Sequence, residues 1–349
     1  MPKSFRFFLL ALIAALALGI AACGDDDDDG GGGGDGGGGG EAEAKSIKAG
    51  VVTDIGGLND RSFNFLANKG LEDAESELGV EGRVLISKSN GDYVPNLTTL
   101  AQQQFDLSVS VGFLMGEATA TVAGKFPSNS FAIVDFPASG LKGKPKNVEG
   151  LLFKEQEAGY LAGYLAGLWA KDNNATTVST VGGQKIPPVD HYIAGFKKGA
   201  SDANSGIKTL NAYSQDFVDQ AKCKEIALDQ IAQGSKVIFQ VAGQCGLGAL
   251  DAAKEKGVQG IGVDADQAYL GDHILTSALK KVDVAVFDAI KRAQDGSFKG
   301  GTDVIATVEN GGVGLGKIGS AGEKYADKMK EITDQIAAGE IADIPDTVK

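Results

Sequence analysis

The chain has 349 residues, of which 46 are acidic and 33 are basic, giving a net charge of −13. Eight of the acidic residues lie in 24–44, so from residue 45 onward 38 acids face 31 bases and the net charge is only −7. A nucleic-acid backbone requires clustered lysine and arginine, so this balance argues against nucleic acid as a partner. The 305 residues from 45 onward are enough for two domains with separate cores.

The first segment of the chain has the features of an export signal. Lys3 and Arg6 precede "FFLLALIAALALGI", an apolar run of 14 residues, which is shorter than the ~20 residues that a spanning helix needs. The run leads into "IAAC", the pattern of a bacterial lipoprotein signal in which the cysteine, Cys23, is lipidated after cleavage. A retained anchor helix is the alternative. We expect a signal peptide over 1–22 and a cell-membrane protein anchored by lipid on the extracytoplasmic face.

The next stretch is rich in glycine and aspartate. Residues 24–44 contain no apolar side chain larger than alanine, so they cannot bury enough surface to offset the entropy of the chain. We therefore expect a disordered tether over 23–45 that holds a globular body away from the membrane.

From Lys48 onward, short apolar runs rich in β-branched residues alternate with helical patterns. The expected strands are 47–52, 83–87, 107–113, 131–135 and 148–153 in the first half, and 176–182, 207–213, 236–242 and 258–264 in the second. The expected helices of the first half are 62–78, 94–105 and 116–125. Continuous apolar strands between helices are typical of parallel sheets covered on both faces. The pattern predicts two doubly wound α/β domains.

In such sheets ligands bind beyond the carboxyl ends of the strands. The residues that follow the expected strands are Asp54, Asp135, Phe217, Gly243 and Asp264. These five positions are therefore the first candidates for a binding site.

The loop 53–62 does not suit phosphate. It carries two carboxylates, Asp54 and Asp60, against the single cation Arg61, whereas a phosphate site needs free backbone N–H groups and no fixed negative charge beside it. An uncharged ligand fits this loop better.

Hydrolytic or metal chemistry has little support in the sequence. The two histidines, His191 and His273, have no paired ligand four residues away, and no G-x-S-x-G motif is present. Asp264 and Asp266 in "GVDADQ" are weak evidence for a metal. We expect a protein that is not an enzyme and that carries no metal and no cofactor.

Two aromatic residues lie where a flat ligand would meet them. Phe63 and Phe217 occupy loops or helix starts of what we take to be opposite domains, so closure of the domains would bring their rings to two sides of a ligand. Such stacking would suit a nucleobase, to which it contributes roughly 1–3 kcal/mol per base. The alternative for Phe63 is a place in the core between helix and sheet.

Charged residues would add selectivity. Asp135 ends an apolar strand and would need donors such as a purine N–H or a water molecule. Asp264 and Lys280 would together grip a diol. The alternatives are a cap or turn for Asp264 and an ion pair or solvated face for Lys280, while Asp60 or Ser62 would cap the helix that follows.

Several sequence stretches resemble the basic membrane lipoprotein family, the solute-binding proteins of ABC importers that include purine nucleoside receptors. The stretches are "VTDIGGLNDRSFN", "FAIVD", "EAGYLAGYLAGL", "VIFQVAGQCGLGALDAAKEKG", "GVDADQ" and "LTSALKKVDVAVFDAIK". They occur in order between about residues 47 and 316. The resemblance implies a type I periplasmic-binding-protein fold with two lobes, three crossovers and a nucleoside in the cleft.

The resemblance also implies the ligand site, which comprises Asp54, Asp60, Phe63, Asn64, Asp135, Phe217, Gly243, Asp264 and Lys280. Phe63 and Phe217 match the two stacking faces, the second more loosely because "SQDFVDQ" departs from the family pattern. Gly243 offers a backbone contact. Asp54 and Asp60 match patterned positions without an assigned contact.

The remaining four positions divide between the two parts of a nucleoside. Asn64 and Asp135 match the residues that read the edge of the base. Asp264 and Lys280 match the ribose-binding pair. These roles are what the resemblance implies.

The other two cysteines, Cys223 and Cys245, are an expected disulfide pair in an oxidising compartment. The alternative is a reactive thiol, which has no histidine nearby in sequence to support it. By the resemblance, many family members carry glycine and a small or hydroxyl residue at these positions, and two simultaneous departures favour a bridge.

The resemblance gives the expected organisation. We expect one lobe from 46–154 with 278–303, the other from 155–277 with 304–349, and hinges near 153–155, 276–281 and 301–310. The implied function is a monomeric receptor that passes a purine nucleoside to an ABC permease and its ATPase. The alternatives are a receptor for a sugar or signalling molecule, a sensor partner, and a nucleoside hydrolase.

Overall fold

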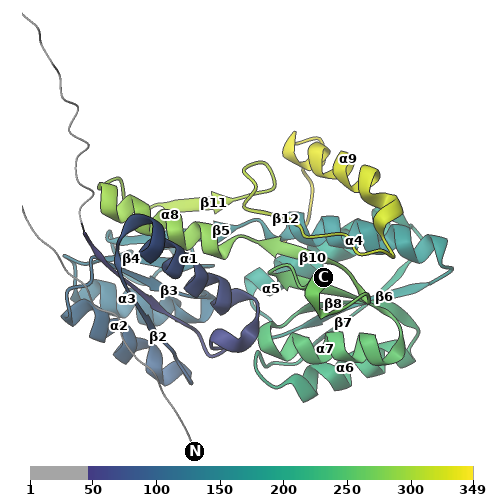
Figure 1. Ribbon diagram of the computed structural model, residues 1–349, viewed down its shortest axis with the longest axis horizontal. Helices are drawn as coiled ribbons and strands as arrows, with labels where there is room; N and C mark the ends of the chain where they lie inside the picture. The colour runs from purple at the N-terminus through teal and green to yellow at the C-terminus, as the bar shows by residue number, and fades with distance from the viewer. Residues whose placement is uncertain (1–45, 349) are drawn as a thin grey trace, which may run out of the picture. The chain divides into compact units, whose positions relative to one another are not determined.

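The structure is a computed structural model that describes residues 46–348. These residues fold into two six-stranded sheets, each flanked by helices (Figure 1). The expected signal peptide, Cys23 and the tether lie outside the described residues. Within the described part of the chain, no helix has the length and apolar character needed to cross a membrane.

The first sheet is entirely parallel, with the strand order β11-β5-β4-β3-β1-β2. Its strands are β1 (Lys48–Val52), β2 (Glu81–Leu85), β3 (Leu107–Ser110), β4 (Ser130–Val134), β5 (Val148–Phe153) and β11 (Asp303–Ala306). Its helices are α1 (Phe63–Leu78), α2 (Tyr93–Gln102), α3 (Gly116–Lys125) and α8 (Val282–Asp295).

Successive side chains of the first sheet enter two different cores. Val51 packs in the cluster that includes α1 and α8, and Val52 packs in the cluster that includes α2 and α3. Because the side chains of a strand alternate between the two faces of a sheet, a strand covered on both faces must be apolar throughout. This explains the continuous apolar runs of the sequence.

The second sheet has the order β12-β10-β9-β8-β6-β7, and only β12 is antiparallel to its neighbour. Its strands are β6 (Thr177–Gly182), β7 (Lys208–Tyr213), β8 (Ser235–Val241), β9 (Gln259–Asp264), β10 (Ile274–Lys280) and β12 (Val313–Leu315). The helices that accompany it are α4 (Glu155–Asp172), α5 (Pro187–Ala203), α6 (Gln220–Ala232), α7 (Gly243–Lys256) and α9 (Ala326–Ala337).

Short 3-10 helices connect several of these elements. They are η1 (Leu58–Asp60), η2 (Asn90–Asp92), η3 (Phe113–Met115), η4 (Ala138–Gly140), η5 (Ala268–Leu270) and η6 (Glu323–Tyr325). Five of them, η1 to η5, follow the carboxyl ends of β1, β2, β3, β4 and β9 respectively.

Helices α4 and α5 approach each other through glycine. A Cβ atom on Gly159 would lie 2.2 Å from the carbonyl oxygen of Tyr192, and one on Gly163 would lie 2.0 Å from that of Phe196. No larger residue fits at this distance, which explains the glycine spacing in "EAGYLAGYLAGL". The close packing fixes the amino-terminal ends of the two helices, which carry side chains of the site described below.

The chain passes between the two sheets three times, after β5, after β10 and after β11 (Figure 1). The crossing segments are joined by backbone hydrogen bonds from Lys154 N to Ala306 O at 2.8 Å and from Lys281 N to Gly312 O at 2.9 Å. The expected lobe boundary at 278 falls inside β10, and the one at 303 falls at the first residue of β11. The predicted fold, two doubly wound α/β lobes, is confirmed by the sheet topology.

Candidate ligand site

A cavity lies between the carboxyl ends of the strands of the two sheets. All nine residues expected in the ligand site line it: Asp54, Asp60, Phe63, Asn64, Asp135, Phe217, Gly243, Asp264 and Lys280. The cavity measures about 70 Å³, whereas an engineered apolar cavity of about 150 Å³ is known to hold one benzene molecule. A ligand larger than benzene therefore requires the walls of this cavity to move.

Asn64 organises the loop before α1. Its Nδ2 donates to Asp54 Oδ1 at 2.7 Å and to Asp60 Oδ2 at 3.1 Å, and its Oδ1 accepts from Asp54 N at 3.1 Å. Both amide hydrogens are therefore already committed to carboxylates. Asn64 lines the cavity, but its main contacts in this structure hold the loop together.

Asp60 supports the start of α1. Its carboxylate accepts hydrogen bonds from the backbone N–H groups of Ser62 at 3.1 Å, Asn64 at 2.7 Å and Phe65 at 3.1 Å. The first N–H groups of a helix have no partner within the helix, so a side-chain acceptor stabilises its end. Asp60 thus orients α1, whose first residue is Phe63.

Ser62 connects the two lobes instead of capping the helix. Its hydroxyl lies 2.8 Å from Asp264 Oδ2 and 3.0 Å from Val263 O. Tyr192 OH donates to the other carboxylate oxygen, Asp264 Oδ1, at 3.1 Å. Asp264 is therefore held between a residue of the first lobe and a helix of the second.

Lys280 forms the second polar connection across the cavity. Its ammonium lies 2.6 Å from Asp135 Oδ1 and 2.9 Å from Glu155 Oε1, and the side chain is only 2% exposed. The same ammonium lies 5.1 Å from the centre of the Phe63 ring and 4.8 Å from that of Phe153, which is cation–π distance. Lys280 joins a first-lobe carboxylate, Asp135, to a helix of the second lobe.

Two of the strand-end aspartates have left-handed backbone conformations. The φ angle is 69° at Asp135 and 60° at Asp264. A non-glycine residue in this region is uncommon, although aspartate tolerates it better than most. At both positions the turn directs a carboxylate into the cavity instead of continuing the strand.

Burial governs the titration of these acids. It raises the pKa of Asp54 to about 6, and it raises the pKa of Asp135 to about 7 even though Lys280 opposes the shift. Burial also raises the pKa values of Asp60 and Asp264.

The lysine at the centre keeps its charge. Burial alone would lower the pKa of Lys280, but the carboxylates of Asp135, Glu155 and Asp264 raise it above its usual value. For Glu155, burial opposes ionisation, yet Lys280 and His191 together lower its pKa. The described cavity is richer in carboxyl groups than in cations, so a bound phosphate would be repelled.

The second-lobe aromatic, Phe217, is half-buried between β7 and α6. A Cβ atom added at Gly183 would lie 2.3 Å from Cε1 of Phe217, so the ring rests directly on that glycine. Phe63 is also half-buried, and both rings pack on one side against the core while lining the cavity. Gly243, with φ of 55°, begins α7 close to the carbonyl of Phe217.

Residues 47–346 match the family described as ABC transporter substrate-binding protein PnrA-like. The chain belongs to this family. One relative, the ABC transporter nucleoside-binding protein BmpA of Lactococcus lactis, is 35% identical over 84% of this chain and 88% of its own length. An uncharacterized lipoprotein of Pyrococcus abyssi is 37% identical over 84% of this chain and 76% of its own. The predicted resemblance to the basic membrane lipoproteins is confirmed.

Solved structures agree with this assignment to the substrate-binding family. The crystal structure of an ABC transporter solute-binding protein from Aeropyrum pernix superposes with a TM-score of 0.77 at 28% identity, covering 86% of this chain and 94% of the other. A solute-binding protein from Conexibacter woesei, at 23% identity and a TM-score of 0.69, shows the same fold over 87% of this chain and 100% of the other.

Sequence reasoning missed two polar side chains of this substrate-binding protein's cavity region, and it did not identify apolar lining residues such as Phe113, Leu114 and Ile186. Glu155, 2% exposed, bonds both Lys280 and His191, the latter at 3.0 Å. Tyr192 lines the cavity and bonds Asp264. Both lie in helices, so the rule that directs attention to strand ends does not reach them. The only signal for Glu155 was its position at the expected hinge near 153–155.

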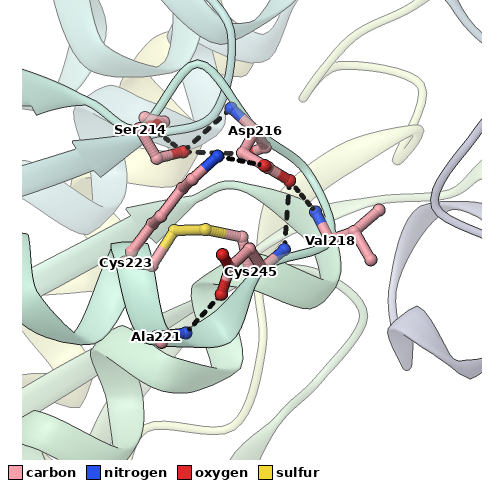
Figure 2. Close-up of polar contacts among 9 residues, drawn as sticks. Ser214, Asp216, Val218, Ala221, Cys223 and Cys245 are labelled. Atoms are coloured by element: carbon pink, nitrogen blue, oxygen red, sulfur yellow. Dashed lines mark hydrogen bonds and ion pairs between the residues drawn. A yellow bond between two sulfur atoms is a disulfide. The ribbon is translucent and has the colours of Figure 1, made fainter.

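The two cysteines of the described chain, Cys223 and Cys245, are joined by a disulfide with a Cα–Cα distance of 5.5 Å (Figure 2).

No group of three or more His, Cys, Asp or Glu side chains between residues 46 and 348 is placed to hold a metal ion.

Proposed function

We propose that this member of the substrate-binding family captures a purine nucleoside, such as guanosine, inosine or adenosine, in the interlobe cavity. The observation that carries the proposal is the gathering of two half-exposed rings, four aspartates and one lysine on that single cavity. The name of the Lactococcus lactis relative, a nucleoside-binding protein, supports it.

The stacking surfaces in this proposal are Phe63 and Phe217, which belong to different lobes. A base between the two rings would gain roughly 1–3 kcal/mol from each stacking contact and would exclude water from its faces. Stacking tolerates different bases, so the rings alone would not select one purine.

Hydrogen bonds to the base would come from aspartates. Asp54 Oδ1 accepts hydrogen bonds from Asn64 Nδ2 at 2.7 Å and from Gly56 N at 2.9 Å. The other carboxylate oxygen, Oδ2, is the one nearer to Gly112. In our proposal Asp54 Oδ2 and Asp135 accept from donors on the base. Asn64 contacts the base edge only through Oδ1, since its amide hydrogens are committed.

The ribose would bind between Asp264 and Lys280. A carboxylate accepts from two hydroxyl groups and an ammonium donates to one, which suits a diol. Gly243, at the start of α7, would add a backbone contact. Ligand hydroxyls would compete with Ser62 and Tyr192 for Asp264, so binding would exchange one set of hydrogen bonds for another.

The charge of the cavity favours a nucleoside over a nucleotide. Four aspartates and one cation, Lys280, line the cavity, so a phosphate placed there would be repelled by the ionised carboxylates in a medium of low dielectric constant. We therefore expect inosine to bind much more tightly than its monophosphate.

Binding would require the lobes to separate and close again. The small volume of the cavity, together with the Ser62–Asp264 and Asp135–Lys280 contacts across it, describes a closed arrangement. Three crossing segments between the sheets are suited to act as hinges. A ligand that contacts both lobes would shift the population towards the closed form.

A thermal-shift screen tests the proposal. Purine nucleosides, pyrimidine nucleosides, free bases, nucleotides and sugars are each added to the purified protein, because a ligand that binds only the folded state raises the melting temperature. At a concentration one hundred times the Kd, the stabilisation is about 2.7 kcal/mol. Stabilisation by a sugar alone, or by nucleotides as strongly as by nucleosides, would overturn the proposal.

We further propose that the protein performs no chemistry on its ligand. Incubation with inosine followed by chromatography should return inosine unchanged. The appearance of free hypoxanthine at a catalytic rate would instead identify a nucleoside hydrolase.

The remaining parts of the proposal concern the membrane. Lipid on Cys23 would anchor the receptor on the extracytoplasmic face, and a permease with its ATPase would take the nucleoside from it. Mass spectrometry of the mature amino terminus should find a diacylglyceryl cysteine, and Cys23→Ser should release the protein from membranes. Co-purification of importer subunits would separate transport from a sensing role.

A further inference from the structure

Cys245 holds both ends of the segment 217–223. Its backbone N–H donates to the carbonyl oxygen of Phe217 at 3.0 Å, and its sulfur is bonded to Cys223. The segment therefore forms a closed ring, with one hydrogen bond and one covalent bond meeting at a single residue. Cys245 itself is fixed, because it is fully buried in the first turn of α7.

Asp216, which directly precedes this segment, accepts hydrogen bonds from residues inside it (Figure 2). Asp216 Oδ1 accepts from the backbone N–H groups of Val218 at 2.8 Å and Asp219 at 3.0 Å, and Oδ2 accepts from Lys222 Nζ at 2.7 Å. Ser214 Oγ donates to Asp216 O at 2.8 Å. These bonds define a turn, but most of them lie at an exposed surface.

Little apolar burial supports the same segment. Val218 is 40% exposed, and Asp219 and Gln220 are exposed as well. The half-buried Phe217 ring rests on Gly183 and packs on one side against the core, while it also lines the cavity. The backbone that carries the ring is held by the bonds of Cys245 and Asp216, so these bonds help to set where the ring lies over Gly183.

We propose that the Cys223–Cys245 disulfide positions the Phe217 ring for ligand binding. This inference rests on the proposed function, since it assigns Cys223 and Cys245 as positioning residues for the second stacking face. An unrestrained loop must be ordered when the ligand binds, which costs about 0.5–1.5 kcal/mol for each rotamer-rich side chain that is immobilised. The disulfide removes part of this cost before binding.

The main test compares the native protein with the variant C223A/C245A, in both a Phe217 and a Phe217→Ala background. With inosine as the probe in calorimetric titration, we expect the double alanine variant to bind about two- to tenfold more weakly. In the F217A background the same change should have almost no effect. An equal loss in both backgrounds would show a general structural role and would overturn the proposal.

A matched control breaks another link between the same two helices. Lys224 of α6 pairs with Glu255 of α7 at 3.1 Å, at an exposed site one residue beyond Cys223, the last residue of the segment. K224M should leave inosine affinity unchanged within about twofold. A loss as large as that of C223A/C245A would mean that any loosening of α6 against α7 weakens binding, which contradicts the proposal.

A second variant moves the ring without touching sulfur. Gly183→Ala would place a methyl group 2.3 Å from Cε1 of Phe217, which is too close for two carbon atoms, so the ring must shift. We expect G183A to weaken inosine binding in the disulfide-bonded protein. If C223A/C245A fails to fold, the native protein treated with a phosphine reductant takes its place in the comparison.

A readout without ligand separates this inference from the proposed function. Amide hydrogen exchange should be slow for Cys245, Val218 and Asp219 in the native protein and clearly faster after the disulfide is broken, while amides of β1 remain unchanged. If no nucleoside binds, the proposed function fails, but exchange still reports whether the disulfide holds the segment. Unchanged exchange at these three amides would overturn the inference by itself.

Discussion

The two loops that present aromatic rings to the cavity are held in place by different means. Phe63 follows a loop whose polar groups are buried, with Asp60 and Asn64 each 1% exposed. Phe217 belongs to a loop whose hydrogen bonds lie near solvent, where Lys222 is 51% exposed, and which a disulfide closes. Buried hydrogen bonds are costly to break, whereas water can replace the partner of an exposed one at little cost in free energy. The comparison suggests that the exposed loop needs a covalent link to reach comparable order.

The largest expected effect results from removing the carboxylate that supports the first loop. Asp60→Ala removes the acceptor of three backbone N–H groups in a buried place, so we expect the free energy of unfolding to fall by about 3–5 kcal/mol. Asp216→Ala, the equivalent change in the second loop, should cost about 1 kcal/mol, because water replaces the lost acceptor. Urea unfolding of both variants measures the difference. Equal costs would show that the two loops are not held differently.

The pH dependence of stability should have opposite signs in the two loops. The pKa of Asp54 is about 6 in the folded protein because of burial, against an ordinary value of 3.8. Between about pH 4 and 6 the folded state holds a proton that the unfolded state has released, so stability falls as the pH rises. At neutral pH, the shifted pKa of Asp54 therefore lowers the free energy of unfolding by roughly 3 kcal/mol. Asp54→Asn should remove that part of the slope.

Asp216 is the matched group in the second loop, because its pKa is shifted in the opposite direction to that of Asp54. Lys222, with the backbone N–H groups of Asp219 and Val218, lowers the pKa of Asp216 to about 2. Its contribution to stability is present above about pH 4 and is lost as the pH falls towards 2. Asp216→Asn should therefore reduce stability at neutral pH and have little effect at pH 2. Urea midpoints of native protein, D54N and D216N between pH 3 and 7 give the test. The prediction is contradicted if D54N and D216N change the slope of stability against pH in the same direction relative to the native protein.

Ligand affinity allows the aromatic rings of the two loops to be compared directly. Phe63→Ala should weaken inosine binding by about 5- to 150-fold, the equivalent of 1–3 kcal/mol of stacking. Phe217→Ala should weaken it less, because the Phe63 ring also contacts the ammonium of Lys280. Leucine at either position serves as the control, since it restores apolar area without a flat face. An unchanged affinity in F63A would favour a ligand that does not stack.

The sequence was most informative about the strands and the residues that end them. The run "FAIVD" predicted both β4 and the position of Asp135, because a strand buried on both faces is apolar until the chain leaves the sheet. Asp54, Asp264 and Gly243 were found by the same reasoning. All three line the cavity as expected.

The site residues that the sequence did not predict depend on packing between segments that are separate in the chain. Glu155 and Tyr192 reach the cavity region only because α4 and α5 approach through Gly159 and Gly163. The commitment of the Asn64 amide to Asp54, ten residues earlier, was also not predictable. It follows from the turn made by η1, which brings the two side chains together after the loop has folded.

The smallest expected effect concerns the exposed ion pair of the second loop. Lys222→Met removes one donor to Asp216 and leaves both backbone donors and the disulfide in place. Because exposed ion pairs contribute little and are screened by salt, inosine affinity should change by about twofold or less. The change should vanish in 0.5 M sodium chloride.

The same substitution should act more strongly once the disulfide is absent. In C223A/C245A the remaining restraints on Phe217 include the turn around Asp216 and the backbone hydrogen bond from residue 245 to the Phe217 carbonyl, so adding K222M should weaken inosine binding more than it does in the native background. The difference between the two backgrounds is the coupling energy of the ion pair and the disulfide. Strict additivity would mean that the two restraints act on separate parts of the loop, and that the covalent link does not substitute for the missing buried hydrogen bonds.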